Sequence, residues 1–222
     1  MSFDALAPHY RWMEFVLAGN KLQRCRTAFL EDLPQAGNIL LLGEGNGRFL
    51  PACCKQFPDA RITCVDASAV MIAQARQRLM KRGPAYHHVQ FVRADVLTWT
   101  PPSNAAYDLI VTNFFLDCFR SEQLEQIICI VGCASAKNAN WLLADFQVAS
   151  GSVRQLRSKV IVWMMYIFFR AATRLPARKL IPPDSFLQGA GFTLRQRVQT
   201  EWGLLRSDWW QRHGQTDGEI CP

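Results

Sequence analysis

Acidic residues are missing from one long stretch of this sequence. Between residues 146 and 183 there is no aspartate or glutamate. The same stretch carries seven basic residues: Arg154, Arg157, Lys159, Arg170, Arg174, Arg178 and Lys179. Those seven charges equal the formal net charge of the whole chain, +7 at pH 7. We therefore expect the basic character to be local to this segment.

Hydrophobic runs long enough to cross a membrane are also missing. The basic segment contains an apolar run of ten residues, 160–169, whereas a transmembrane helix needs roughly 20. The first ten residues, MSFDALAPHY, have neither the basic start nor the apolar core of an export signal. These absences predict a cytoplasmic protein without a transmembrane helix.

Metal-binding and disulfide spacings are lacking as well. The sequence has eight cysteines but no Cys-x-x-Cys pair, since Cys53 and Cys54 are adjacent and Cys129 and Cys133 are four apart. His87 and His88 are neighbours, which points them to opposite faces of an extended segment. We expect reduced, mostly buried thiols and no metal site.

The composition is that of a globular domain. Half of the 222 residues are hydrophobic and 19% are charged, which excludes a largely disordered chain. The length fits one core, because single cores commonly grow to ~250 residues before splitting. We expect one domain over residues 1–222, with an N-terminal cap helix at about 4–33 and an insertion at about 150–182.

Strand and helix signals alternate along the chain, which predicts a layered α/β fold with a largely parallel sheet. The expected strands are 38–42, 61–65, 89–92, 107–112, 141–148, 192–198 and 204–211. The expected helices are 10–33, 47–57, 68–81, 121–131 with Ser121 as N-cap, and 184–189. The last two strands are joined by only a few residues, which requires an antiparallel pair.

The most informative motif is Gly43-Glu44-Gly45-Asn46-Gly47, between an apolar strand and a helix. In such a loop, backbone N–H groups and a helix N-terminus face a ligand at the carboxyl end of the sheet. Glycine allows unusual φ angles and a close approach of backbone to ligand. The alternative is a tight turn that only needs glycine.

The glycine spacing argues against a dinucleotide. The dinucleotide fingerprint is G-x-G-x-x-G, whose third glycine permits close helix–strand packing. Here the spacing is G-x-G-x-G, and Arg48 stands where that glycine is required. A smaller nucleoside without a pyrophosphate fits this loop better.

This loop is the first feature by which nearly the whole chain resembles the class I S-adenosylmethionine-dependent methyltransferases. The loop residues, Gly43, Glu44, Gly45, Asn46 and Gly47, are similar to the family's first loop. The opening FDALAPHY is similar to the start of quinone-type small-molecule methyltransferases. The resemblance implies a Rossmann-like α/β fold, whose mostly parallel seven-stranded sheet has an antiparallel last strand and helices on both faces.

The resemblance also implies further S-adenosylmethionine contacts. Asp66 ends the second strand where the family binds the ribose, with Ala67 beside it; Asp95 and Val96 follow the third strand where the family binds adenine. Asn113 and Phe114 end the fourth strand beside the transferred methyl group.

Each of these roles has a physical basis and an alternative. A carboxylate accepts hydrogen bonds from both ribose hydroxyls or from an exocyclic amine, and Val96 and Met71 are apolar enough to enclose a ring. Alternatively, Asp66 begins a helix whose first turn favours an acid, and Asp95 simply ends a strand. The family's usual acidic residue two positions before the loop is Leu41 here, which leaves Glu44 as the nearest carboxylate to approach the cofactor's ammonium group.

The catalytic candidates are few. Methyl transfer from a sulfonium depends mainly on alignment and exclusion of water, and a base is needed only for weak nucleophiles. His9 and Tyr10 in the N-terminal segment and Asp117 beyond the fourth strand are the best-placed candidates. A purely structural role is the alternative for each of them.

The insertion offers two interpretations. If residues 153–173 are helical, one face carries Val160, Trp163, Met164, Ile167 and Ala171. Arg170, Arg174 and Arg178 would form a basic stripe. The helix is either a lid whose aromatic residues form pocket wall and core, or an element that rests on an anionic membrane surface. A nucleic-acid partner is disfavoured, because Phe168 and Phe169 lie in an unbroken apolar run rather than alternating with basic residues.

The sequence thus predicts a methyltransferase acting on a small hydrophobic or aromatic acceptor at O, N, S or C. A non-catalytic cofactor-binding or regulatory protein is one alternative, and an NAD-dependent oxidoreductase is another. The pattern does not specify the acceptor or the oligomeric state.

Overall fold

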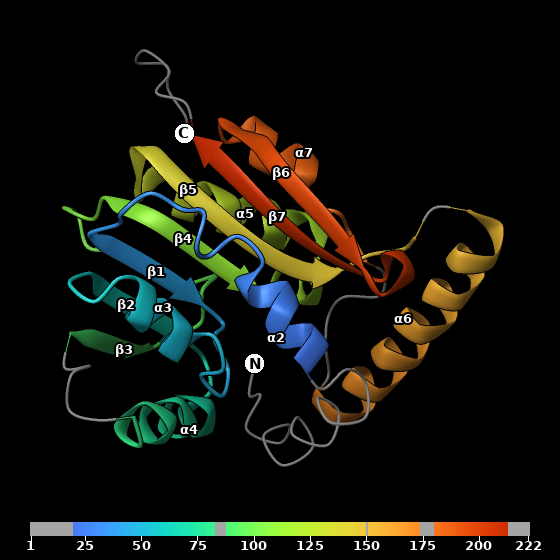
Figure 1. Ribbon diagram of the computed structural model, residues 1–222, viewed down its shortest axis with the longest axis horizontal. Helices are drawn as coiled ribbons and strands as arrows, with labels where there is room; N and C mark the ends of the chain where they lie inside the picture. The colour runs from blue at the N-terminus through green and yellow to red at the C-terminus, as the bar shows by residue number, and fades with distance from the viewer. Residues whose placement is uncertain (1–19, 83–87, 150, 174–179, 213–222) are drawn as a thin grey trace.

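A seven-stranded sheet forms the centre of the protein, seen in a computed structural model that describes residues 20–82, 88–149, 151–173 and 180–212 (Figure 1). The strands are β1 (Asn38–Leu42), β2 (Arg61–Asp66), β3 (Val89–Arg93), β4 (Tyr107–Asn113), β5 (Ser135–Phe146), β6 (Phe192–Thr200) and β7 (Leu205–Arg212). Their order is β3-β2-β1-β4-β5-β7-β6. The first five are parallel, and β7 runs antiparallel to both of its neighbours. The predicted fold class is confirmed.

The parallel register determines where a site can form. Leu42 pairs with Val65 of β2 and with Thr112 of β4, and Asn113 pairs with Ala144 of β5. Because parallel strands run in one direction, the carboxyl ends of β1 to β5 lie along the same edge of the sheet. Ligands of open α/β sheets bind at this edge.

Both faces of the central strands are buried, which the continuous apolar strand sequences require. On β1, Leu40 and Leu42 belong to one core cluster, whereas Ile39 and Leu41 belong to the other. Trp141 at the centre of β5 is fully buried, and its Nε1 donates to the Thr112 hydroxyl at 2.9 Å. The sheet therefore separates two cores, each covered by helices.

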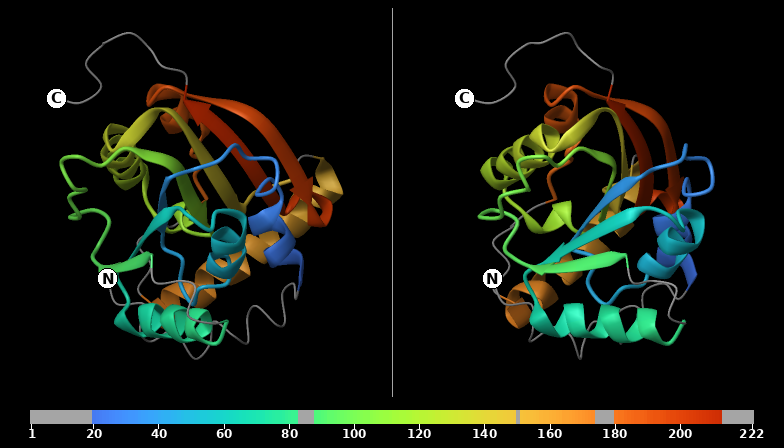
Figure 2. Two further views of the ribbon diagram at one scale, coloured as in Figure 1. Left: turned by 60° about the vertical axis from the view of Figure 1, so that its left-hand side comes forward. Right: turned by 90° about the vertical axis from the view of Figure 1, so that its left-hand side faces the viewer.

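The helices of the described chain are α2 (Asn20–Thr27), α3 (Leu50–Gln56), α4 (Ala69–Met80), α5 (Ser121–Cys133), α6 (Ser152–Thr173) and α7 (Asp184–Gly189). Short 3₁₀ turns lie at η3 (Leu116–Cys118) and η4 (Glu201–Gly203). Figure 2 shows α2 and α3 on one face of the sheet and α5 and α7 on the other. The apolar residues of α3 belong to one core cluster and those of α5 and α7 to the other.

Several predicted boundaries are wrong at one end. The N-terminal helix, predicted to reach residue 33, ends at Thr27, and Phe29, Leu30 and Leu33 then enter the core from a turn. The helix predicted from Gly47 begins at Leu50. Ser121 is the first helical residue rather than the cap; the backbone N–H of Arg120 donates to Gln123 Oε1 at 3.1 Å.

The fifth strand is longer than predicted, because it begins at Ser135. Ser135 pairs with Tyr107, and a register shift lies between Tyr107 and Leu109 of β4. Pairing with a neighbouring strand keeps the polar residues of this first part in the sheet. Their sequence pattern did not predict a buried strand.

Most of the cysteines behave as predicted. Cys25, Cys53, Cys54 and Cys64 are buried thiols, and burial raises the pKa of Cys25 to about 11 and that of Cys54 to about 12. Such thiols are unreactive at neutral pH. Cys129 is disulfide-bonded, so the prediction of reduced thiols is wrong at that residue, because spacing along the chain does not show which cysteines meet in space.

Candidate functional site

The three glycines of the loop after β1 have different surroundings, although all have positive φ. A Cβ on Gly43 would lie 2.0 Å from the Phe115 ring, and a Cβ on Gly47 would lie 2.7 Å from the Ala75 backbone of α4. A Cβ on Gly45, with φ +63°, would meet nothing within 4 Å. Gly47 thus allows α4 to pack closely, a role that the third glycine of the dinucleotide fingerprint has one residue later, at position 48. Gly45 instead presents its backbone to open space.

Glu44, between these glycines, caps the helix that follows. Its Oε1 accepts hydrogen bonds from the backbone N–H groups of Phe49 at 2.8 Å and Leu50 at 3.0 Å. Burial raises the pKa of Glu44 to about 7. The hydrogen bond from Leu50 and the charge of Arg26 lower this pKa, but burial outweighs them. The carboxylate that the sequence offers for a cofactor ammonium group is therefore also engaged with the N-terminus of α3.

Glu44 should make the stability of the protein pH-dependent. Because its pKa is raised from 4.5 to about 7 in the folded state, folding favours the protonated form. The free energy of unfolding should therefore fall as the pH rises from about 4.5 to about 7. Urea denaturation of Glu44→Gln should show a shallower slope over this range, because Gln keeps an acceptor oxygen without titrating.

Asp117 and Asp145 also have raised pKa values, so part of the slope should remain in Glu44→Gln. The exposed Glu122→Gln is a matched control and should retain the full slope. An unchanged slope in Glu44→Gln would contradict the titration of this carboxyl group.

Asp66 at the end of β2 ties the glycine loop to the neighbouring strand. Its Oδ2 accepts from Gly45 N at 3.1 Å, and its Oδ1 accepts from Ser68 N at 2.8 Å. Ser68 Oγ in turn accepts from Met71 N at 3.1 Å and caps α4. Asp66 thus lies beside Gly45, and Ala67 and Met71 follow it towards and into α4, where the sequence predicts the ribose and adenine contacts.

The third strand contributes its predicted pair to the same edge. Asp95 follows β3, is partly buried, and accepts from Leu97 N through Oδ1 at 3.1 Å. Val96 is buried in the core cluster that contains Leu42 and Val65. Ala94 N donates to Asp66 O at 3.1 Å, which brings this turn beside the end of β2.

Asn113 is the most unusual polar residue of the edge. It ends β4, is 7% exposed, and both its Nδ2 and its Oδ1 are buried without a hydrogen-bond partner. Leaving a buried amide unsatisfied costs about 1–3 kcal/mol, so such a group in a folded protein calls for a partner such as a water molecule or a ligand. Phe114 follows with φ +53°, a strained conformation that concentrates at functional sites.

Arg26 is a neighbour that the sequence did not reveal. It is 6% exposed, although it belongs to the polar helix α2. Its guanidinium lies 5.1 Å from the centre of the Phe114 ring, and its charge lowers the pKa of Glu44. A buried arginine between the glycine loop and the end of β4 places a fixed positive charge beside the edge.

The catalytic candidates fall in two places. Asp117 lies in η3, just beyond β4, and Cys118 Sγ donates to its Oδ1 at 3.4 Å. His9 and Tyr10 lie outside the described residues. Asp145 near the end of β5 was not predicted, although an acidic residue at the end of a buried strand is the same signal that identified Asp66.

The insertion is helical, and the face predicted to carry Val160 and Trp163 points away from the protein. In α6, Ser158 and Val162 are buried, whereas Val160 and Trp163 are exposed. Ser158 Oγ accepts from Ala149 N at 3.0 Å, which fixes the inward face. The side chains of Met164, Ile167, Arg170 and Ala171, and residues Arg174 and Arg178, lie outside the described part.

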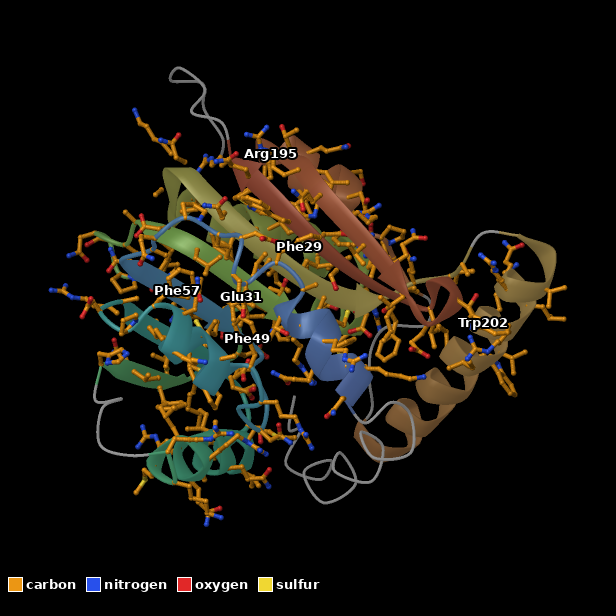
Figure 3. All side chains as sticks on the ribbon, in the orientation of Figure 1. Phe29, Glu31, Phe49, Phe57, Arg195 and Trp202 are labelled. Atoms are coloured by element: carbon orange, nitrogen blue, oxygen red, sulfur yellow. The ribbon has the colours of Figure 1, made fainter. Side chains whose placement is uncertain are left out.

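A strained turn joins α6 to the sheet. Glu201 and Trp202 of η4 both have positive φ, and Trp202 projects near α6 in Figure 3. The Arg157 guanidinium lies 5.4 Å from the Trp202 ring centre, and its Nη1 donates to Glu201 O at 3.2 Å. Lys21 of α2 bonds the Glu201 carboxylate at 2.6 Å, so η4 connects α2 with α6.

Within the described ranges, no group of three or more His, Cys, Asp or Glu side chains is arranged to hold a metal ion. Among the helices that the structure describes, none combines the length and the hydropathy that crossing a bilayer requires.

Comparison with known proteins shows what the loop and its neighbouring strands are similar to. Residues 39–131 match the sequence model of a methyltransferase domain. The trans-aconitate 2-methyltransferase of Paracidovorax citrulli is 38% identical over 81 residues, 36% of this chain and 28% of that protein. A malonyl-[acyl-carrier protein] O-methyltransferase of Paenibacillus sp. is 39% identical over 77 residues, 34% of this chain and 27% of that protein. The matched part thus spans less than a third of these relatives.

Solved structures share the fold over almost the whole chain. Mitomycin 7-O-methyltransferase aligns with 96% of this chain and 61% of its own, with a TM-score of 0.71 and 17% identity. The Burkholderia thailandensis 1,6-didemethyltoxoflavin-N1-methyltransferase, solved with its substrate and S-adenosylhomocysteine, aligns with 94% of this chain and 88% of its own, with a TM-score of 0.62 and 16% identity.

Proposed function

We propose that this chain, whose residues 39–131 match a methyltransferase domain model and whose fold is shared with solved methyltransferases, is an S-adenosylmethionine-dependent methyltransferase. When bound, S-adenosylmethionine supplies an activated methyl group on a positively charged sulfur. The observation that carries the proposal is Gly45, which presents backbone of positive φ to open space. A glycine without a nearby side chain permits the close approach of a nucleoside to the protein backbone.

The residues of the edge fit the parts of the cofactor. The loop of residues 43–47 would lie along the methionine part, Asp66 and Ala67 beside the ribose, and Met71, Asp95 and Val96 around the adenine. Asn113 and Phe114 would lie near the transferred methyl group. Asn113 has two buried polar atoms that a ligand would satisfy, which supports a bound molecule at the end of β4.

The acceptor is proposed to be a small hydrophobic or aromatic molecule. Phe114 and Phe146 meet at the ends of β4 and β5, with ring centres 5.0 Å apart. An aromatic pair at this position favours a flat or apolar acceptor. Two proteins of the same fold are named for methylating mitomycin and 1,6-didemethyltoxoflavin, which is consistent with a small-molecule acceptor.

Transfer of a labelled methyl group tests the activity directly. The protein is incubated with deuterated-methyl S-adenosylmethionine and a cell extract, and mass spectrometry should find a product shifted by one labelled methyl group. Adding S-adenosylhomocysteine in excess should suppress that product. Binding of S-adenosylmethionine without any labelled product would indicate the alternative, a non-catalytic cofactor-binding protein, whereas binding of NAD instead would indicate an oxidoreductase.

We further propose that the chain is cytoplasmic and contacts the inner membrane surface through α6. The supporting feature is a set of exposed large hydrophobic side chains, which we call the α6 patch: Val153, Leu156, Val160 and Trp163 of α6, with Trp202 of η4 next to the helix through Arg157. On α6 these residues recur every three or four positions, which makes one stripe. The exposed Arg154, Arg157 and Lys159 flank it, and basic residues beside an apolar stripe favour an anionic lipid surface.

Vesicle sedimentation tests this contact. The protein should pellet with vesicles that contain anionic lipid several-fold more than with neutral vesicles, and added salt should weaken the binding. Val153→Asp, at a side chain that is 79% exposed, should reduce binding. Val70→Asp on α4 is the matched control, since Val70 is 40% exposed outside the patch. Equal and negligible binding to both kinds of vesicle would refute the contact.

A further inference from the structure

Two carboxyl groups meet where the parallel strands β4 and β5 end. Asp117 lies in η3 beyond β4, and Asp145 is the penultimate residue of β5. Asp145 Oδ1 accepts from Phe146 N at 2.9 Å, and its carboxyl group also accepts the backbone N–H of Asp117. Asp145 therefore anchors the turn that carries Asp117.

The surroundings raise the pKa of both carboxyl groups. Asp145 is 3% exposed, and burial, followed by the charge of Asp117, raises its pKa well above the ordinary value, although Arg206 lowers it. Burial also raises the pKa of Asp117 to about 6, against the hydrogen bond from Cys118. At neutral pH, Asp117 with its pKa of about 6 is therefore mostly ionised.

The other ionisable groups around the pair are few. Cys118 is beside Asp117 on η3, and Arg206 of β7 pairs with Asp145 in the sheet register. Arg206 is itself held by Asp184 of α7 at 2.7 Å. The charge of Asp145 also raises the pKa of Cys25 of α2.

The location distinguishes this pair from a structural ion pair. Asp117 remains partly exposed, so it can contact a bound molecule. Asn113, with its two unsatisfied buried polar atoms, lies four residues before it at the same end of β4. Carboxyl groups whose pKa is raised by burial destabilise a folded protein at neutral pH, and perturbed acids of this kind concentrate at functional sites.

We propose that Asp117 accepts the proton of an acceptor molecule whose attacking atom is a hydroxyl oxygen or an N–H nitrogen, and that Asp145 positions it. The inference rests on the proposed methyltransferase function. In the step, a lone pair of the acceptor forms the bond to the methyl carbon, the carbon–sulfur electron pair leaves with the sulfur, and the proton of the attacking atom passes to the Asp117 carboxylate. Asp145 is a positioning residue, because it acts through the backbone of Asp117.

The class of acceptor follows from this proton. A hydroxyl or N–H group is a weak nucleophile that gains from a proton acceptor, whereas a thioether or a tertiary amine has no proton to lose. A carboxylate with a pKa of about 6 is ionised at physiological pH and still basic enough to take a proton. The structure therefore favours O- or N-methylation of a protic acceptor.

The experiment measures the rate of labelled methyl transfer into the extract product against pH, together with the affinity for S-adenosylhomocysteine by calorimetry. Wild-type protein should lose activity below about pH 6. Asp117→Asn should lower the rate about 100-fold or more while S-adenosylhomocysteine affinity stays within about twofold of the wild type. The exposed Asp59→Asn is the matched control and should behave as wild type.

Two variants of Asp145 test its positioning role through the pH dependence of the rate, which a purely structural role would not change. Asp145→Asn keeps an oxygen that accepts the Asp117 N–H, so its rate and acid limb should stay near those of the wild type. Asp145→Leu has a similar shape without that oxygen, so Asp117 should become more solvated. Its rate should fall about tenfold, and the acid limb should move to lower pH, because burial is the main cause of the raised pKa. This pair of variants decides the matter even if Asp117→Asn does not fold.

The outcomes separate the inference from the proposed function. No labelled product with wild-type protein would overturn the methyltransferase function, and the role of Asp117 with it. A product formed at wild-type rate by Asp117→Asn, or a product methylated on a thioether or a tertiary amine, would overturn the inference alone. So would an acid limb that is the same in Asp145→Asn and Asp145→Leu.

Discussion

Gly45→Ala should fold but lose affinity for S-adenosylmethionine at least about tenfold. Gly47→Ala should instead lower the free energy of unfolding of the protein. The new Cβ of Gly45→Ala meets no protein atom within 4 Å, and its cost is the positive φ of +63°, about 1–2 kcal/mol for a residue with a side chain. The same methyl group would then occupy the space that the cofactor approaches.

Gly47→Ala combines a positive φ of +77° with a Cβ 2.7 Å from the Ala75 backbone. Helix α4 would have to move, and overpacking of this kind costs about 1–3 kcal/mol beyond the backbone strain. Urea denaturation and calorimetry with S-adenosylmethionine measure the two effects side by side. Wild-type affinity in a folded Gly45→Ala would show that the loop is only a turn.

The second large effect is expected far from the loop, at the ionic cluster that joins α7 to β6 and β7. Asp208→Ala should destabilise the protein by about 3–5 kcal/mol, the usual cost of breaking a buried ion pair on one side. The Asp208 side chain is fully buried and accepts from Arg197 Nε at 2.6 Å and Nη2 at 2.7 Å. Arg206, 3.7 Å from it and almost fully buried, would lose the same counter-charge.

Asp184→Ala is the matched comparison for Asp208→Ala. Asp184 bonds the same two arginines, but its side chain is 29% exposed, so water can replace it and its loss should cost clearly less. Burial alone would raise the pKa of Asp184, but the hydrogen bonds from Arg197 and Arg206 outweigh it and hold the pKa below its ordinary value. Urea denaturation at neutral pH compares the two variants. Equal losses would show that burial does not set the cost.

Local patterns in the sequence were sufficient for the sheet. The strand 38–42 was predicted with the boundaries of β1, and the helix 184–189 with those of α7, because Gly43 ends the apolar run and the Ala190-Gly191 pair follows the helical segment. The ends of other elements were decided by contacts. α3 starts late because Glu44 caps it at Leu50, and β5 starts early because Ser135 finds a partner in β4.

The candidate residues that follow strands came from the resemblance to a family, and their roles stay predictions. Asp66, Asp95 and Asn113 lie at or just after the ends of β2, β3 and β4, whose carboxyl ends parallel strands bring to one edge. Arg26 was missed because it lies in a polar helix whose docking brings it beside Phe114. On α6, the spacing of three and four residues identified a stripe, but it could not show that Ser158 and Val162, rather than Val160 and Trp163, face the protein.

By itself the sequence determined the order of strands and helices, the glycine loop and the acids at the strand ends, because each depends on neighbouring residues and on the periodicity of burial. The tertiary structure alone decided what surrounds each group. In the structure, Gly45 faces open space and Gly47 packs against α4. The Glu44 side chain binds the N-terminus of α3, and the Asp145 carboxyl group of β5 accepts the backbone N–H of Asp117. Such pairings join residues that are distant along the chain, and only the packing of the sheet and its helices places them together.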